Sequence, residues 1–184
     1  MISRMPIWKN STIQTKPSFE TNIILGIDPG IANTGYACLL EQDGRISLID
    51  AGVFITKKNP TPYRIKLIYD FFCSLLAKYD VGSISIEKIF FNKNVKTAMI
   101  IEEVRGALLL LSAQKSISIH QYTPLEVKKS LTLFGKASKL EVKLMAERII
   151  NSPLPKSDDA CDAVAVALCH SILEKEEEPI DIFD

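Results

Sequence analysis

The sequence predicts an α/β fold in which a mixed, five-stranded β-sheet is flanked by helices. Apolar segments of strand length alternate with longer segments whose apolar residues recur every three or four positions, the spacing of a helix. The first three expected strands follow one another without a helix, whereas helices separate the later strands. Antiparallel and parallel pairs are therefore expected in one sheet. The length of 184 residues suits one domain with its own buried core.

The first half of the chain supplies three strands and one helix. The apolar run at 23–27 ends in an Asp-Pro-Gly turn sequence and is typical of a buried central strand. Residues 35–40 and 46–55 are expected to form the next two strands, and the sequence Gln-Asp-Gly-Arg at 42–45 is a hairpin turn signal between them. Apolar residues at helical spacing then predict a helix over 61–78.

The second half alternates strands and helices before it becomes purely helical. We expect a strand at 83–86, a helix at 96–114, a strand at 117–122, and helices that begin at 123, 138 and 158, the last two reaching 150 and 174. Thr123 suits the N-cap of its helix because a threonine hydroxyl accepts a bond from a free backbone N–H, and Pro124 suits the first helical position. Ligands and chemistry are expected at the carboxyl ends of the parallel strands.

Composition excludes several classes of protein. A hydrophobic content of 47% and a charged content of 24% are ordinary for a soluble fold, not for a disordered, collagen-like or disulfide-scaffold chain. No apolar run has the length of a membrane span. The four cysteines form no Cys-x-x-Cys pair, which favours buried, reduced thiols in a cytoplasmic protein over a zinc site.

The two ends of the chain differ from its body. Residues 1–22 are expected to be a flexible leader without a secretory signal, 23–173 to be the domain, and 174–184 to be a flexible acidic tail. The whole chain has 22 basic and 22 acidic residues, but the tail holds six acids and one lysine, so the remainder is net basic. A basic body suits a polyanionic partner; solvated lysines on helix faces are the alternative interpretation.

Acidic residues stand at three places where the expected elements meet. Asp28 ends the first strand and Glu87 follows the strand at 83–86, while Asp159 and Asp162 lie on one face of the last helix. Each has an ordinary alternative: Asp28 as a turn residue, Glu87 as a surface residue, and the helix acids as charges near an N-terminus that Ser157 or Asp158 caps. Together they can converge on one site.

Such a site has the chemistry of a hard cation. Carboxylate oxygens without histidine favour Mg²⁺ or Mn²⁺ over zinc. Two such ions activate a water molecule and stabilise the leaving oxygen of a phosphodiester, and a basic body would hold the nucleic acid. The acidic pattern therefore predicts a metal-dependent nuclease.

Several motifs, in this order, resemble the RuvC family of Holliday-junction resolvases in the ribonuclease H-like superfamily. They span about 23–173, nearly the whole expected domain. The motifs are Ile24-Leu25-Gly26-Ile27-Asp28-Pro29-Gly30 with Thr34-Gly35-Tyr36, Ile86-Glu87-Lys88-Ile89-Phe90 with Lys93-Asn94, Val104-Arg105-Gly106, Tyr122-Thr123-Pro124 with Val127-Lys128, Lys139, and Asp158-Asp159-Ala160-Cys161-Asp162-Ala163.

The resemblance implies a ribonuclease H-like fold and a homodimer that makes paired nicks in opposing strands of a four-way DNA junction. It also implies two Mg²⁺ ions per active site, with Mn²⁺ able to substitute, and the RuvA–RuvB branch-migration complex as a partner. The family carboxylates fall on Asp28, Glu87, Asp159 and Asp162. The family's DNA-contacting positions fall on Phe90, Lys93, Lys128 and Lys139. Phe90 would contact a base at the junction; packing in the core beside Phe91 is the alternative for that side chain.

The chain departs from the family pattern in few places. Lys88 stands where Gln is common, and Asp159 stands where some members have His, so no carboxylate is missing. The main alternative is another ribonuclease H-like nuclease, acting on RNA–DNA hybrids or of the YqgF type, which cleavage of a hybrid but not of a junction would support. An actin-like ATP-binding protein would need a second domain for which 184 residues leave no room, although ATP binding would revive it. The four carboxylates argue against a non-catalytic binder of DNA structures.

Overall fold

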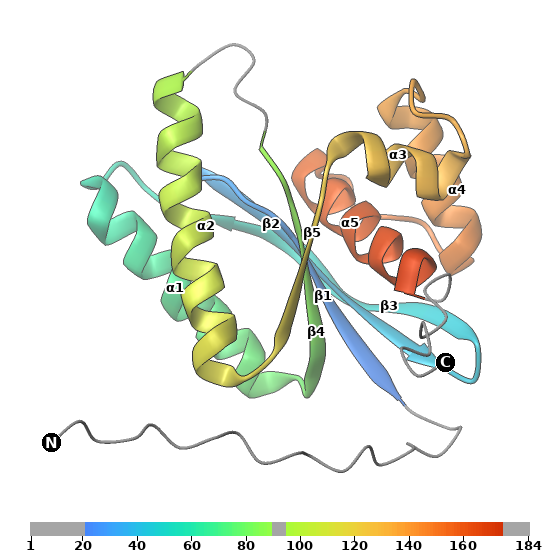
Figure 1. Cartoon of the computed structure of the whole chain (residues 1–184), viewed down its shortest axis with the longest axis horizontal. Coiled ribbons are helices and arrows are strands. Elements are labelled where there is room, and N and C mark those ends of the chain that lie inside the picture. Colours follow the sequence, from blue (N-terminus) through green and yellow to red (C-terminus); the bar gives the residue numbers. More distant parts are fainter. Residues whose placement is uncertain (1–20, 90–94, 175–184) are drawn as a thin grey trace, which may run out of the picture.

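A computed structural model describes residues 21–89 and 95–174 and shows one sheet between two layers of helices (Figure 1). The strand order across the sheet is β3-β2-β1-β4-β5. The strands are β1 (Asn22–Asp28), β2 (Asn33–Gln42), β3 (Arg45–Ile55), β4 (Val81–Glu87) and β5 (Ser118–Tyr122). The helices are α1 (Thr61–Lys78), α2 (Val95–Lys115), α3 (Pro124–Thr132), α4 (Lys139–Ile150) and α5 (Asp158–Glu174).

The sheet is mixed, as the sequence predicts. β1 pairs with β2 and β2 with β3 in antiparallel fashion, whereas β4 lies parallel to both β1 and β5. Asp43 and Gly44 turn the β2–β3 hairpin with positive φ angles of 52° and 74°. Both central residues of a type I′ turn need this conformation, so the Asp-Gly pair fits the tight connection.

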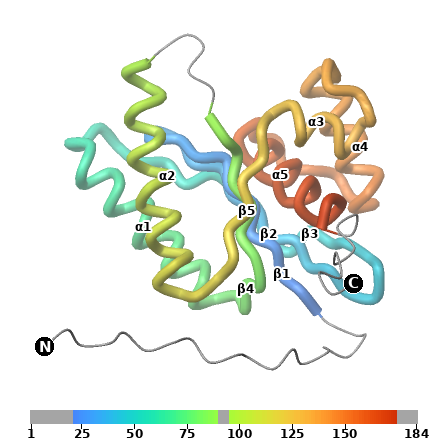
Figure 2. Tube along the Cα trace, viewed as in Figure 1, coloured from blue at the N-terminus to red at the C-terminus, as the bar shows by residue number. Residues whose placement is uncertain are grey.

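Each face of the sheet has its own apolar core, and Figure 2 shows the helices that cover the two faces. Side chains alternate along a strand, so Ile24 packs with α3, α4 and α5, while its neighbour Leu25 packs with α1 and α2. Helix α5 lies directly on the sheet, and α3 and α4 pack on the side of α5. Helix α5 is buried over most of its length because it is covered from both sides.

Small residues let α5 approach the strands closely. A Cβ atom placed on Gly26 of β1 would lie 2.7 Å from the Cβ of Ala167 and would overlap the carbonyl oxygen of Ala163. A Cβ atom on Gly35 of β2 would overlap the carbonyl oxygen of Asp159 in the same way. The glycines therefore fix how near the first turns of α5 stand to the ends of β1 and β2.

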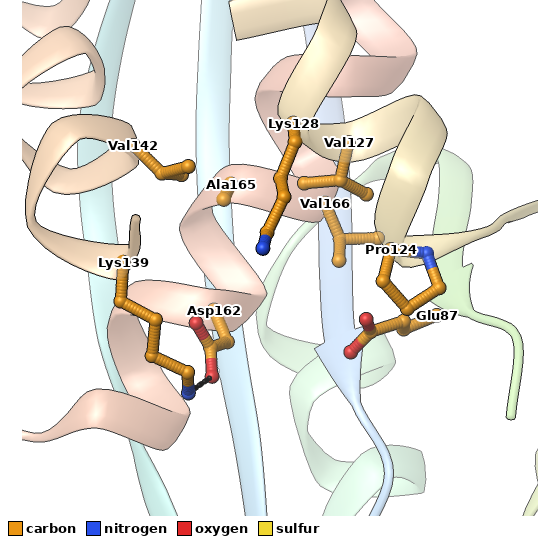
Figure 3. A pocket seen from close by; sticks show the side chains of 9 residues that line it. All are labelled: Glu87, Pro124, Val127, Lys128, Lys139, Val142, Asp162, Ala165 and Val166. Atoms are coloured by element: carbon orange, nitrogen blue, oxygen red, sulfur yellow. Dashed lines mark hydrogen bonds and ion pairs between the residues drawn. The ribbon is translucent and has the colours of Figure 1, made fainter. Parts of the chain in front are cut away.

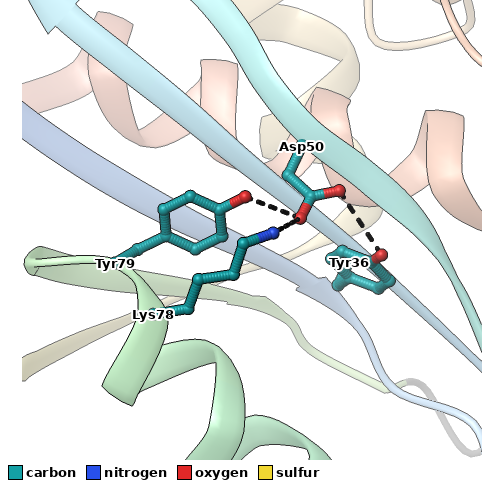
Figure 4. A network of polar contacts seen from close by, with 4 residues as sticks. All are labelled: Tyr36, Asp50, Lys78 and Tyr79. Atoms are coloured by element: carbon teal, nitrogen blue, oxygen red, sulfur yellow. Dashed lines mark hydrogen bonds and ion pairs between the residues drawn. The ribbon is translucent and has the colours of Figure 1, made fainter.

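A polar network at the edge of the sheet secures β3 (Figure 4). The carboxylate of Asp50 accepts hydrogen bonds from the Tyr79 hydroxyl at 2.8 Å, the Lys78 ammonium at 3.1 Å and the Tyr36 hydroxyl at 3.5 Å. Burial opposes ionisation of this carboxyl, but the bonds from Tyr79 and Lys78 hold its pKa below the usual value. The network lies beside the register shift after Cys38, where β3 carries an extra residue.

All the expected strands and helices are present, with ends that differ by no more than two residues. Thr123 caps α3 as expected. Its hydroxyl accepts a hydrogen bond from the backbone N–H of Glu126, and the Glu126 carboxylate accepts one from the backbone N–H of Thr123. The four cysteines are free thiols, and three of them are buried. No helix within 21–89 and 95–174 combines the length and apolarity needed to cross a bilayer. The leader and the acidic tail stay predictions, since nearly all of their residues lie outside the described ranges.

Candidate active site at the carboxyl ends of β1 and β4

Two of the expected acids come from neighbouring parallel strands. Ile27 of β1 pairs with Ile86 of β4, and Asp28 and Glu87 are the next residues of the two strands. Ile27 and Ile86 belong to the core under α1 and α2. Because successive side chains alternate between faces, Asp28 and Glu87 project on the opposite face, where α5 lies.

The other two acids stand at the start of α5. Asp159 and Asp162 are half-buried and belong to the first two turns of a helix that begins at Asp158. Gly35 pairs with Asp28 across the β1–β2 ladder and also touches the backbone of Asp159. This double contact brings the first turn of α5 to the end of β1.

The four carboxyl groups interact electrostatically. Burial, followed by the charges of Glu87, Asp162 and Asp159, raises the pKa of Asp28 to about 8, while Lys139 opposes the shift. Burial and the charge of Asp162 also raise the pKa of Glu87. A cluster in which like charges disfavour one another's ionisation is one that a cation would stabilise.

The chemistry of these donors fits a hard divalent cation. All four are carboxylates, and a lysine cation already lies among them: the Lys139 ammonium is 2.5 Å from the Asp162 carboxylate. In the part of the chain that the structure describes, no three acidic, histidine or cysteine side chains stand close enough together to hold one ion. The four acids therefore share one region and interact electrostatically, but they do not surround a single point. Lys139 neutralises part of the negative charge of this region.

A pocket opens beside the acids, between β4 and helices α3, α4 and α5 (Figure 3). Glu87 and Asp162 lie on its walls, and Lys128 from α3 and Lys139 from α4 reach toward them. The hydrophobic part of the lining comes from these same helices. The residues are Glu87, Pro124, Val127, Lys128, Lys139, Val142, Asp162, Ala165 and Val166. Negative oxygens for a cation and ammonium groups for a phosphate therefore meet in one cavity.

Arg105 is a residue at this site whose function is not evident from the sequence. Its side chain is only 5% exposed and reaches from α2 to the end of β4. The guanidinium donates to the carbonyl oxygen of Glu87, to the side-chain oxygen of Gln121 at 2.5 Å, and to Glu102 at 3.2 Å. The motif Val104-Arg105-Gly106 marks the position, but only the fold shows that it fixes the backbone that carries Glu87.

The structure places six of the eight expected site residues in one region: Glu87, Asp162, Lys128 and Lys139 line the pocket, and Asp28 and Asp159 interact electrostatically beside it. The other two, Phe90 and Lys93, lie outside the described residues. Their expected contacts with DNA stay predictions.

The strand order, the two helical layers and the acidic edge between β1, β4 and α5 define a ribonuclease H-like α/β protein. A family model described as crossover junction endodeoxyribonuclease RuvC matches residues 24–170. The RuvC protein of Caldicellulosiruptor saccharolyticus is 40% identical over 163 residues, which cover 84% of this chain and 98% of that relative.

Two solved structures of Thermus thermophilus RuvC share the fold. One is 27% identical, has a TM-score of 0.78, and covers 84% of this chain and 96% of its own. The other, in complex with a Holliday junction substrate, is 24% identical with a TM-score of 0.76 and the same coverage. With a family model that spans most of the domain and a relative at 40% identity, the chain belongs to the RuvC family of crossover junction endodeoxyribonucleases.

Proposed function

We propose that this protein is a structure-selective endonuclease that resolves four-way (Holliday) DNA junctions by metal-dependent hydrolysis of phosphodiesters, in recombination and repair. Family membership supports the activity. The observation that carries it in this chain is that four carboxylates interact electrostatically at the ends of β1 and β4, where two of them and two lysines line one pocket. Oxygen donors and basic side chains in one place suit phosphodiester hydrolysis.

Asp28, Glu87, Asp159 and Asp162 would hold the metal. Carboxylate oxygens favour Mg²⁺, with Mn²⁺ as a substitute, and two ions would match the number of carboxylates. When bound, the metal supplies activation of a water molecule and stabilisation of the charge on the leaving oxygen. The raised pKa of Asp28 supports this assignment, because a bound cation would offset the repulsion between these acids.

The surrounding side chains position the acids and the substrate. Arg105 holds the main chain of Glu87, and Gly35 lets Asp159 approach Asp28. Lys128 projects into the pocket and would bind a backbone phosphate of the strand to be cut. Lys139 is bonded to Asp162 and would exchange this carboxylate for a phosphate when DNA and metal arrive.

The finer parts of the proposal follow from the family. A homodimer would place one site on each of two opposing strands, which paired nicking requires. Phe90 would stack on a base at the junction, and Lys93 would contact its backbone. The RuvA–RuvB branch-migration complex would deliver the substrate, and the cytoplasm is where that substrate is found.

The test compares acidic variants on a synthetic four-way junction. Asp28→Asn or Glu87→Gln should reduce nicking in Mg²⁺ about a thousandfold, since metal chemistry supplies several kcal/mol. Junction binding in a chelator should stay close to that of the unmodified protein, because phosphate contacts come from the lysines. Asp158→Asn is the matched control, since Asp158 is exposed at the start of the same helix and should keep normal nicking.

Two results would contradict the proposal. Near-normal nicking by Asp28→Asn would show that the Asp28 carboxylate does not take part in metal binding. Cleavage of an RNA–DNA hybrid with no cleavage of the junction would show that the substrate is a hybrid and not a four-way junction.

A further inference from the structure

The connection between α3 and α4 presents two large apolar side chains to solvent. Leu133 is 91% exposed and Phe134 is 60% exposed. Leu133 ends α3 with φ 60° and ψ 7°, a left-handed conformation that side chains with a branched carbon chain rarely adopt. We call these two residues the apolar tip.

The turn that carries the apolar tip is well built. The Thr132 hydroxyl donates to the Lys128 carbonyl at 2.7 Å and accepts from the Phe134 N–H at 3.2 Å. The Leu133 N–H bonds to the Lys129 carbonyl, and the Ala137 N–H to the Phe134 carbonyl, at 2.9 and 3.1 Å. The backbone thus holds both side chains outward in a defined position.

This arrangement is unfavourable for the isolated fold. A glycine would fit the left-handed position without strain, and a polar residue would suit the exposure. Strained or exposed apolar residues in a fixed turn point to a contact with another molecule.

The charges around the apolar tip indicate a polyanion. Lys129 and Lys136 are exposed on either side of it. Two lysines that line the active-site pocket flank the tip: Lys128 lies five residues before Leu133 on α3, and Lys139, the first residue of α4, lies five residues after Phe134. At a helical rise of 1.5 Å per residue, Leu133 stands about 8 Å from Lys128 along the axis of α3.

The acidic side chains of this helix pair nearest the tip are engaged elsewhere. The carboxylates of Glu126 and Glu141 accept from the backbone N–H groups of the N-cap residues Thr123 and Ser138, and so complete the capping boxes of α3 and α4. Residues 126–141 carry four lysines and two glutamates, so the region that joins the tip to the pocket is net basic, as a nucleic-acid surface requires.

We propose that Leu133 and Phe134 contact unstacked bases of the junction next to the strand held by Lys128 and Lys139. Bases at a branch point are less constrained by stacking than those in a duplex. Apolar or aromatic side chains of a protein can therefore pack against such an exposed base. This inference rests on the proposed function. It assigns the apolar tip to recognition of branched DNA, not to the hydrolysis itself.

The experiment measures binding of a fluorescently labelled four-way junction, and of a linear duplex, in a chelator. Leu133→Gly and Phe134→Ala should each weaken junction binding about tenfold. Duplex binding should change less than twofold, because the lysines remain. Leu67→Ala is the control: Leu67 is an exposed leucine of α1, on the opposite side of the sheet, and its loss should leave both affinities unchanged.

A measurement of thermal stability separates recognition from structure. Leu133→Gly should melt at the same temperature as the unmodified protein or higher, because glycine relieves the left-handed strain and removes an exposed apolar group. Weaker junction binding without lower stability would establish the inference.

Two results would overturn it. One is unchanged junction affinity in both tip variants. The other is a change of oligomeric state in those variants with junction affinity per dimer unaltered, which would make the tip a protein–protein contact. If instead the unmodified protein neither binds nor nicks the junction, the proposed function itself fails, so the two failures are distinguishable.

Discussion

Gly35→Ala tests how strictly the fold positions the acids. The added methyl group would overlap the carbonyl oxygen of Asp159 and come within 3.3 Å of the backbone nitrogen of Ala160. Non-bonded heavy atoms pack at roughly 3.5 Å and the overlap with that oxygen is deep, so the start of α5 must move away by about 1.5 Å. Overpacking of this kind costs about 1–3 kcal/mol of stability, and a misplacement of about 1 Å reduces an enzymatic rate by about a hundredfold.

The assay measures nicking and the free energy of unfolding for the same variant. We expect nicking by Gly35→Ala to fall about a hundredfold, and stability to fall by about 2 kcal/mol. Gly106→Ala is the control for adding a methyl group, because space is open around Gly106 inside α2 and alanine should stabilise that helix by about 1 kcal/mol. A Gly35→Ala protein that nicks at the normal rate would refute the idea that this contact sets the position of Asp159.

Three further predictions concern other parts of the fold. Arg105→Met should slow nicking more than it weakens junction binding, and should lower stability by about 3 kcal/mol, because buried acceptors such as the Glu87 carbonyl lose their donor. Lys139→Gln should tighten Mg²⁺ binding, measured by calorimetry, since the ammonium no longer competes for its carboxylate partner, yet should slow nicking. Burial and the neighbouring His120 lower the pKa of His170 to about 4, from 6.5 in the unfolded chain. Between pH 4 and pH 6.5, His170 is neutral in the folded protein and protonated in the unfolded chain, so unfolding takes up a proton. The free energy of unfolding that depends on His170 is therefore complete above pH 6.5 and should fall by about 3 kcal/mol as the pH drops to 4. Urea unfolding of the unmodified protein and of His170→Gln should show this as a pH-dependent difference; a constant difference would contradict it.

The sequence predicts the fold well because its local signals agree with the tertiary structure. The apolar run before Asp28 is central in the sheet, and Thr123 with Pro124 begins α3. The Asp43-Gly44 turn fixes the β2–β3 hairpin. Each of these signals acts over a few residues, so no knowledge of distant contacts is needed.

The site is predictable only in part, because its contacts join distant segments. Strand ends and helical spacing predict that the acids meet, but not that Lys139 bonds to Asp162 or that Arg105 reaches the backbone of Glu87. The left-handed conformation of Leu133 is also hidden, since leucine gives no signal for it. Such features depend on how α2, α3 and α4 pack, which no local pattern encodes.

The order in which the acids occur along the chain has a consequence for protein synthesis. Asp28 and Glu87 belong to strands that are complete once the ribosome has passed the middle of the domain, whereas Asp159 and Asp162 belong to α5, the last described helix. A nascent chain that has folded its sheet but not yet released α5 holds only half of the carboxylates. A prematurely terminated product would lack the same half. With the active site proposed above, incomplete chains would not cleave DNA, and nuclease activity would begin only when the final helix docks.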